Sequence, residues 1–185
     1  MSDEMIGEVC REKLLKLRCS VIIPTYNNAG TLASVVSEIL EYCDDVIVVN
    51  DGSTDDTEQI ISSFGERIRS LTFEKNKGKG VALQCGLAYA KRLGFKYAIS
   101  IDSDGQHYPA DIPVFAEAIE NNPGTLFVGA RNLQAEGMPG KNTFANKFSN
   151  FWFRIETGIR LEDTQSGYRS YPFENTSFYS RMLTG

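Results

Sequence analysis

Two aspartates, Asp102 and Asp104, stand one residue apart at the end of an apolar stretch, in the sequence SIDSDGQH. Side chains two positions apart in an extended segment point the same way, so both carboxylates can face one site. Two like charges at short range repel, and one of them would take up a proton unless a cation lies between them. A hard divalent ion with oxygen ligands resolves that conflict. The alternative is a polar turn that caps the next helix, because Asp111 and Pro113 are typical of a helix start.

His107, the only histidine of the chain, follows this pair of aspartates. A lone histidine favours a hydrogen-bonded structural role over metal binding, and the neighbouring oxygen ligands suit a harder ion better. The spacing excludes a calcium loop of the EF-hand type. With Asp102 as the first position, His107 stands where glycine is required and Pro113 where glutamate is required.

Two further segments carry groups that could bind a nucleotide. Asp51 in VVNDGSTDD can accept hydrogen bonds from a nucleobase or a sugar at a strand end. A capped helix start explains the acidic and hydroxyl residues after Asp51 but not Asp51 itself. Lys79 in KNKGKG could attract a diphosphate near a helix start, although the spacing is not that of a P-loop. A solvated basic loop is the alternative reading of this second segment.

The segment EDTQSGYRSYP contains Asp163 and Arg169. A carboxylate and an arginine in this arrangement could act as an acidic base and a phosphate contact. The alternative is a surface turn that leads into a strand.

Apolar runs alternate with helical patterns, which predicts an α/β fold with a mostly parallel sheet covered on both faces. The predicted strands are Cys19–Pro24, Asp45–Asn50, Ile68–Glu74, Tyr97–Asp102 and Thr125–Ala130. In such sheets ligands bind beyond the carboxyl ends of the strands. The polar segments PTYNN, NDGS and DSDGQ follow the first, second and fourth strands, so we expect them to lie along one rim.

Composition limits the function classes. The chain has 185 residues, of which 42% are hydrophobic and 23% charged, as in ordinary globular domains. A net charge of −5 argues against broad binding to nucleic acid. The four cysteines form no C-x-x-C pair, so we expect reduced, mostly buried thiols in a cytoplasmic protein.

The first 18 residues are interrupted by charge, so they lack the apolar centre of a signal peptide and predict a short helix or a loose leader. Apolar runs do not reach the roughly 18 residues needed to span a bilayer. Aromatic residues between Phe144 and Ile155 recur at helical spacing, which favours a core-facing stripe over a membrane-surface face.

Together these segments resemble the inverting family 2 glycosyltransferases, and most closely the branch that contains dolichol-phosphate mannose synthase and bacterial polyprenyl-phosphate sugar transferases. The matching pieces occur in the family's order and are SVIIPTYNNAGTL, DVIVVNDGSTDDT, NKGKGVAL, SIDSDGQHYP, GAR and DTQSGYR. The resemblance implies a GT-A fold, with a catalytic domain over residues 19–185. Because the sequence ends soon after SGYRSYP, a C-terminal truncation of that domain is an alternative to a complete one.

The resemblance also implies a role for individual residues in holding the sugar donor, a nucleotide-diphospho-sugar with uracil or guanine. Pro24, Tyr26 and Asp51 would hold the base and ribose. Asp102 and Asp104, with Gln106 beside them, would hold Mg²⁺ or Mn²⁺ and the nucleotide. Asn50 departs from the family pattern, since relatives often have aspartate there, and this weakens any inference about the base.

For the remaining chemistry, the resemblance implies that Arg131 and Arg169 meet the phosphates and that Asp163 lies near the acceptor. If the acceptor is a glycan hydroxyl, Asp163 is the candidate base. If it is a polyprenyl phosphate, the nucleophile is already ionised, because the second pKa of a phosphate monoester is about 6.

The expected activity is therefore that of a hexosyltransferase in cell-envelope polysaccharide biosynthesis, cytoplasmic or peripheral at the cytoplasmic membrane face. A nucleotide-sugar-binding domain without turnover is the alternative. A sugar nucleotidyltransferase fits less well, because it expects a glycine-rich loop where this chain has PTYNN.

Overall fold

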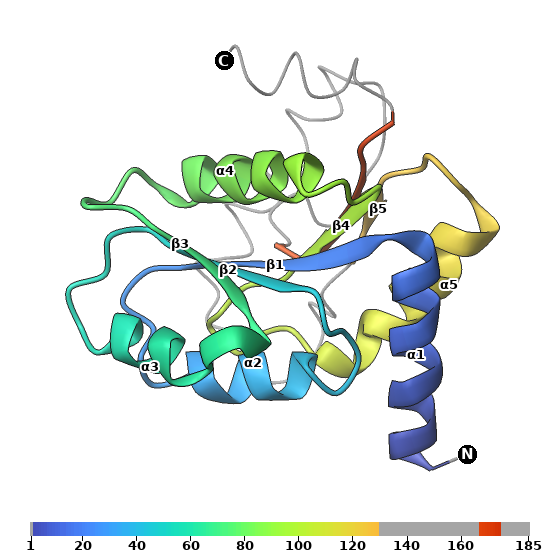
Figure 1. Cartoon of the computed structure of the whole chain (residues 1–185), viewed down its shortest axis with the longest axis horizontal. Coiled ribbons are helices and arrows are strands. Elements are labelled where there is room, and N and C mark those ends of the chain that lie inside the picture. Colours follow the sequence, from blue (N-terminus) through green and yellow to red (C-terminus); the bar gives the residue numbers. More distant parts are fainter. Residues whose placement is uncertain (1, 130–166, 175–185) are drawn as a thin grey trace, which may run out of the picture.

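The computed structural model of the chain describes residues 2–129 and 167–174 (Figure 1). Arg131, Asp163 and the aromatic stripe from Phe144 to Ile155 lie outside these residues. The elements are, in chain order, α1 (Asp3–Leu17), β1 (Cys19–Thr25), α2 (Leu32–Ile39), β2 (Val46–Asn50), α3 (Thr57–Ser63), the 3-10 turn η1 (Gly65–Arg67), β3 (Arg69–Thr72), α4 (Lys79–Arg92), β4 (Tyr97–Ser100), the 3-10 turn η2 (Pro109–Asp111), α5 (Ile112–Asn121), β5 (Phe127–Val128) and β6 (Arg169–Pro172).

The strands form one sheet in the order β3-β2-β1-β4-β6-β5. Neighbours among β1, β2, β3 and β4 pair in parallel, whereas β6 pairs antiparallel with both β4 and β5. The prediction of a mostly parallel sheet is therefore confirmed. Strand β6 was anticipated only as a strand after a surface turn, and the structure inserts it into the sheet between two predicted strands.

Alternate residues of the central strands pack on opposite faces of the sheet. Val21 and Ile23 of β1 belong to a hydrophobic cluster shared with α1, α2 and α5, whereas Ile22 belongs to a second cluster under α4. Figure 1 shows α4 on one side of the sheet and α2 and α3 on the other. Both faces are thus covered, which explains why β1, β2 and β4 are apolar runs without alternation.

Helix α1 takes up most of the first 18 residues, so the structure has the helix rather than the loose leader. The Ser2 hydroxyl accepts a hydrogen bond from the Met5 N–H and caps the helix. Cys10 and Leu14 are buried in the same cluster as β1. Lys13 also forms an ion pair of 2.7 Å with Glu120 of α5. The helix therefore packs on the sheet domain through both apolar and charged contacts.

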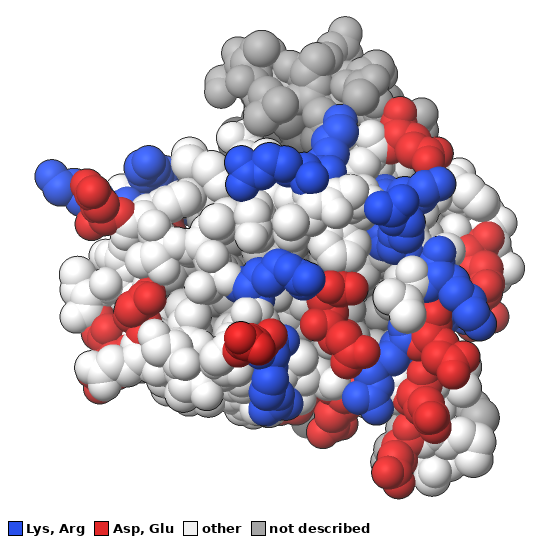
Figure 2. Space-filling model, viewed as in Figure 1, with Lys and Arg blue, Asp and Glu red and all other residues white. Residues whose placement is uncertain are grey.

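No helix in the described part of the chain combines the length and the apolar character needed to cross a bilayer. Figure 2 shows lysine and arginine side chains interspersed with aspartate and glutamate on the visible face, as expected for a mixed surface with a small net charge.

Strand register decides which loops meet. Thr25 at the end of β1 lies opposite Asn50 at the end of β2, and Ser100 at the end of β4 lies opposite Ile22. Ile101 extends this pairing, because its N–H donates to the Ile22 carbonyl at 3.0 Å. The segments that follow the three strands consequently emerge at the same edge of the sheet.

Helix α4 approaches the sheet closely at Gly86. A Cβ atom there would lie 2.7 Å from Ile22 Cγ2 and 3.0 Å from Val49 Cγ2. We expect Gly86→Ala to lower the free energy of unfolding by about 1–3 kcal/mol, the usual cost of overpacking a core. Gly80→Ala in the same helix is the control, because nothing lies within 4 Å of a Cβ there and alanine favours helix. Urea unfolding measures both, and a Gly86 variant as stable as its control would contradict this packing.

The four cysteines are free, and all except Cys85 are buried. Burial raises the pKa of Cys10 to about 11 and that of Cys43 to about 12, and it also raises the pKa of Cys19. Because the thiolate is the reactive form, we expect DTNB at pH 8 to modify Cys85 first and the other three only after unfolding. Rapid reaction of two or more thiols in the native protein would contradict this expectation.

Candidate active site

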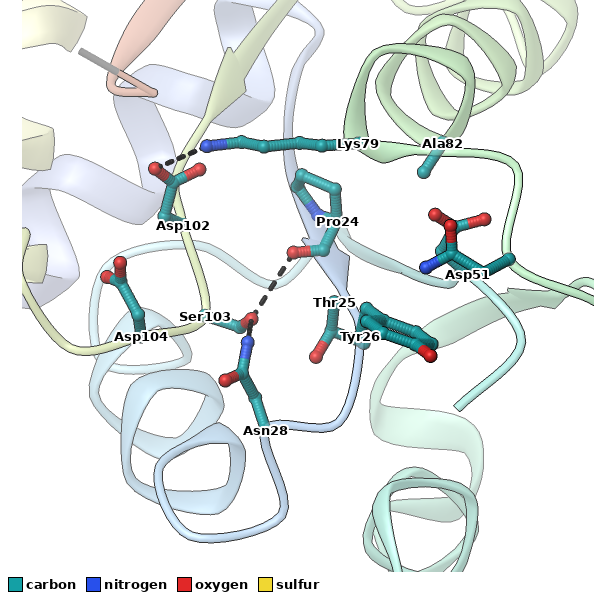
Figure 3. A pocket seen from close by; sticks show the side chains of 11 residues that line it. Pro24, Thr25, Tyr26, Asn28, Asp51, Lys79, Ala82, Asp102, Ser103 and Asp104 are labelled. Atoms are coloured by element: carbon teal, nitrogen blue, oxygen red, sulfur yellow. Dashed lines mark hydrogen bonds and ion pairs between the residues drawn. The ribbon is translucent and has the colours of Figure 1, made fainter. Parts of the chain in front are cut away.

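A cavity of about 240 Å³ opens at the edge of the sheet where β1, β2 and β4 end (Figure 3). The residues that line it are Pro24, Thr25, Tyr26, Asn28, Asp51, Asn76, Lys79, Ala82, Asp102, Ser103 and Asp104. They come from the three polar segments at the ends of these strands, from the loop between β3 and α4, and from the first turn of α4. The structure thus brings together the six residues that the sequence proposed for the nucleotide donor.

Asp102 and Asp104 lie on one side of the cavity, and Lys79 reaches across to Asp102 (Figure 3). Lys79 Nζ donates to Asp102 Oδ2 at 2.7 Å, and His107 Nε2 lies 3.5 Å from the same oxygen. Burial raises the pKa of the Asp102 carboxyl, but the contacts with His107 and Lys79 outweigh burial, so this pKa lies below its usual range. Asp102 is therefore an ionised carboxylate at neutral pH.

The second carboxylate oxygen of Asp102, Oδ1, has a different environment from Oδ2. Oδ1 is buried and has no hydrogen-bond partner within residues 2–129 and 167–174. The backbone of Gly167 packs directly on this carboxylate, so that a Cβ at position 167 would clash with both oxygens. The Ser100 hydroxyl also donates to the Gly167 carbonyl. Glycine is thus required at 167 for the close approach of this distant segment to Asp102.

Ser103, between the two aspartates, fixes their turn to the end of β1. The Asn28 side-chain amide donates to Ser103 Oγ at 2.7 Å, and Ser103 Oγ donates to the Pro24 carbonyl at 3.3 Å. The Thr31 hydroxyl donates to the Ser103 carbonyl at 2.6 Å. These three bonds hold the backbone from which Asp102 and Asp104 project.

Asp104 is exposed at the cavity wall, and its Oδ1 accepts a hydrogen bond from the Gln106 backbone N–H at 3.0 Å. The Gln106 side chain is not among the described residues that line the cavity. Gln106 therefore supports the turn through its backbone, and a ligand role for its side chain stays a prediction.

The donor set can be tested against the predicted metal. Within the described residues, no three histidine, cysteine, aspartate or glutamate side chains gather as they would around an ion held by protein alone. Asp102 and Asp104 nevertheless supply hard oxygen ligands, and the buried Asp102 Oδ1 accepts no hydrogen bond from the part of the chain that the structure describes. Mg²⁺ is usually held by one or two carboxylates plus substrate phosphates. The residues thus fit a divalent ion that shares its coordination with a ligand.

Asp51 is 2% exposed, and both of its carboxylate oxygens are engaged by backbone. The N–H groups of Lys77 and Gly78 donate to them at 2.7 and 2.9 Å. Asp51 thus holds the loop that positions Lys79, a structural role that the sequence analysis did not foresee. A carboxylate has about four acceptor positions, so two of them stay available to a ligand in the cavity.

Asn50 does not contribute to the cavity wall. Its side-chain amide is buried and donates to Glu58 Oε2 at 2.7 Å, while its Oδ1 accepts from the Ser53 N–H at 3.0 Å. An aspartate at this position could not donate to Glu58 and would place two carboxylates together. The asparagine at position 50, which departs from the family pattern, is therefore explained by its hydrogen bond to Glu58. It gives no information about which base the donor carries.

The other predicted residues divide into two groups. Pro24 and Tyr26 line the cavity, and the Tyr26 side chain is 44% exposed at its mouth. Arg169 lies opposite Ser100 of β4, at the start of β6. It is not among the described residues of the cavity wall. Arg131 and Asp163 lie outside the described residues.

Sequence reasoning missed three residues that position the site, namely Asn28, Ser103 and Gly167, whereas it expected a structural role for His107. His107 is buried, with its ring 5.5 Å from that of Tyr168, and it contacts Asp102. The lone histidine beside the aspartates was a signal for this contact. The roles of Asn28 and Gly167 depend on partners more than 60 positions away, and no local pattern indicates them.

Comparison with known proteins adds a family assignment. Residues 20–179 match glycosyl transferase family 2. The chain is 31% identical over 182 residues to UDP-N-acetylglucosamine–dolichyl-phosphate N-acetylglucosaminyltransferase of Methanococcus voltae, covering 88% of this chain and 72% of that protein. It is 28% identical over 163 residues to polyprenol monophosphomannose synthase of Mycolicibacterium smegmatis, covering 83% of this chain and 61% of that protein.

Among solved structures, glucosyl-3-phosphoglycerate synthase from Mycobacterium tuberculosis in complex with Mn²⁺ and UDP-glucose superposes with a TM-score of 0.68 and 27% identity. The match covers 91% of this chain and 60% of that one, so the chain spans about three fifths of the solved relative. The family match covers most of the chain, and the solved relative shares the fold found here. The chain belongs to glycosyl transferase family 2.

Proposed function

We propose that the chain transfers a sugar from a nucleotide-diphospho-sugar to an acceptor, with inversion at the anomeric carbon and with a divalent ion. One observation carries the proposal. A single cavity combines two carboxylates after β4, a lysine at the start of α4 and the loops that follow β1 and β2. Family membership supports the same reaction class.

Pro24, Tyr26 and Asp51 would bind the base and ribose. Tyr26 and Asp51 lie across the cavity from Asp102 and Asp104, with Pro24 between the two sides, and Tyr26 is 44% exposed (Figure 3). The two free acceptor positions of Asp51 suit hydroxyl or N–H donors of a nucleoside. Among relatives, the named donors carry uracil in two cases, so UDP-sugars are the first donors to test and GDP-sugars the second.

The diphosphate would lie between Lys79 and the two aspartates. Lys79 and Ala82 belong to the first turn of α4 and face the cavity, where the unpaired N–H groups of a helix start favour an anion. Asp102 and Asp104, with Gln106, would hold Mg²⁺ or Mn²⁺, and the ion would supply Lewis-acid stabilisation to the leaving diphosphate. Arg131 and Arg169 would contact the phosphates, as the resemblance to the family implies.

The acceptor oxygen would attack the anomeric carbon from the face opposite the diphosphate. We propose a polyprenyl phosphate as acceptor, because curated relatives are named for dolichyl or polyprenyl phosphates. An ionised phosphate needs no base, so Asp163 would orient the acceptor. A glycan hydroxyl is the second acceptor class, for which Asp163 would act as base. A lipid acceptor would be met by peripheral contact with the cytoplasmic membrane face.

The direct test is release of nucleoside diphosphate. UDP- and GDP-sugars are incubated with Mn²⁺ or Mg²⁺ and with undecaprenyl phosphate, dolichyl phosphate or 3-phosphoglycerate, the last because of the solved relative. Acceptor-dependent release supports the proposal. Tight donor binding without release, in a panel that includes every acceptor class, would favour a binding domain without turnover.

We expect Asp102→Asn and Asp104→Asn to lower the transfer rate about 100-fold or more, because metal stabilisation of a leaving group contributes several kcal/mol. Excess EDTA should abolish transfer by the parent chain, and added Mn²⁺ should restore it. Asp56→Asn is the matched control, since this exposed aspartate bonds only Gln59 among the described side chains and does not line the cavity.

Circular dichroism and thermal unfolding must show that both variants fold. Full activity of either one would refute the assignment of this pair.

Asp163→Asn separates the two acceptor classes. With a polyprenyl phosphate acceptor we expect a loss of less than about tenfold in kcat, because the nucleophile needs no base, whereas general-base catalysis contributes about 100-fold or more. Steady-state kinetics with saturating donor measures kcat, and calorimetry measures donor affinity. A large loss in kcat at unchanged donor affinity would contradict the phosphate acceptor and favour a hydroxyl.

A further inference from the structure

We propose that Lys79 is a resident counter-ion of Asp102, which a divalent ion and the donor diphosphate displace together. This inference rests on the proposed function, because it assigns the ion and the diphosphate to this cavity. It adds that the site is occupied by a positive charge of the protein itself before the ligands bind, and that metal and nucleotide binding are therefore coupled.

The Lys79 and Asp102 side chains differ in how far they are exposed and in how freely they can move. The Asp102 side chain is 14% exposed, it packs against the backbone of Gly167, and it keeps His107 as a second neighbour. The Lys79 side chain is 57% exposed and reaches Asp102 from the other wall of the cavity through its flexible stem (Figure 3). The carboxylate is therefore fixed, and the ammonium group is the partner that can move.

A divalent ion cannot simply join this arrangement. An ammonium group that stays 2.7 Å from Asp102 Oδ2 would lie within a few ångströms of an ion on the same carboxylate, where like charges repel strongly. The ion must therefore displace Lys79 and break its ion pair. A divalent ion alone already balances the charge of the two carboxylates and leaves Lys79 without an anionic partner. A divalent ion that brings a diphosphate supplies a new anion for Lys79.

Lys79 needs to move only a short way to find that anion. It is the first residue of α4, and Ala82, one turn further along, lines the same cavity. A diphosphate at this helix start would form an ion pair with Lys79, and its other oxygens would serve as ligands of the divalent ion. Each ligand thus removes an obstacle to the other, which is positive coupling between the two binding steps.

Removal of the lysine charge should strengthen metal binding in the absence of nucleotide. In Lys79→Met we expect Mn²⁺ to bind about three- to tenfold more tightly than in the parent chain, a modest factor because the pair is partly exposed. Lys79→Gln should behave in the same way, whereas Lys79→Arg, which keeps the charge, should bind Mn²⁺ no more tightly than the parent. Isothermal titration calorimetry with Mn²⁺ alone measures all four proteins.

Lys77→Met is the matched control. It removes the same charge two positions away, where the Lys77 ammonium lies 4.8 Å from the centre of the Phe73 ring rather than at Asp102. We expect its Mn²⁺ affinity to stay within about twofold of the parent, because exposed charges at a distance are screened.

A second titration, in saturating UDP or GDP, tests the coupling. The factor by which nucleotide raises Mn²⁺ affinity should be smaller in Lys79→Met than in the parent, and the variant should bind the nucleotide itself less tightly. Equal factors in the two proteins would overturn the coupling.

Mn²⁺ binding to Lys79→Met that is no tighter than in the parent, or too weak to detect in both, would overturn the counter-ion role. Binding that is detectable only in the variant would support it. Failure of the proposed function is recognised separately, because it appears as an absence of nucleoside diphosphate release, while the titration without nucleotide reports only on the ion pair.

Discussion

The candidate site depends on keeping one largely buried carboxylate charged. Asp102 loses solvation at the end of β4, and burial alone would raise its pKa. The Lys79 ammonium group at 2.7 Å and His107 at 3.5 Å reverse that effect, and the backbone of Gly167 packs against the same carboxylate. Helix α4, the segment after β4 and the segment before β6 must therefore meet at Asp102. A charge held in this way is prepared for a cation, whether it comes from the protein or from a ligand.

The sheet provides that meeting point through its order and register. Parallel pairing of β1, β2 and β4 places the segments that follow them at one edge, and hydrophobic burial on both faces fixes this register. The antiparallel strand β6 enters next to β4, with Arg169 opposite Ser100, and so brings Gly167 onto Asp102. Two segments more than 60 positions apart are thus joined by strand pairing rather than by a direct attraction between site residues.

Around the ligand-facing groups, hydrogen bonds of the loops set the geometry. Ser103 binds the turn of the two aspartates to Asn28 and Pro24, and Asp51 binds the loop that carries Lys79. A site that shares a metal ion with its substrate needs such support, because small displacements of the carboxylates weaken coordination. The residues between the chemical groups therefore matter for function as much as those groups do.

The sequence by itself determined the α/β class, the approximate strands and the common edge of the three polar segments. Apolar periodicity reports burial, and parallel strands place their carboxyl ends together, so both follow from local patterns. The sequence also singled out Asp102 and Asp104, because two adjacent like charges after a buried strand need a cation. Only the tertiary structure decided that β6 lies between β4 and β5, that Asp51 holds the lysine loop, and that Lys79 pairs with Asp102. These contacts join segments more than 20 positions apart, and their distances depend on the packing of the whole sheet, which no local pattern encodes.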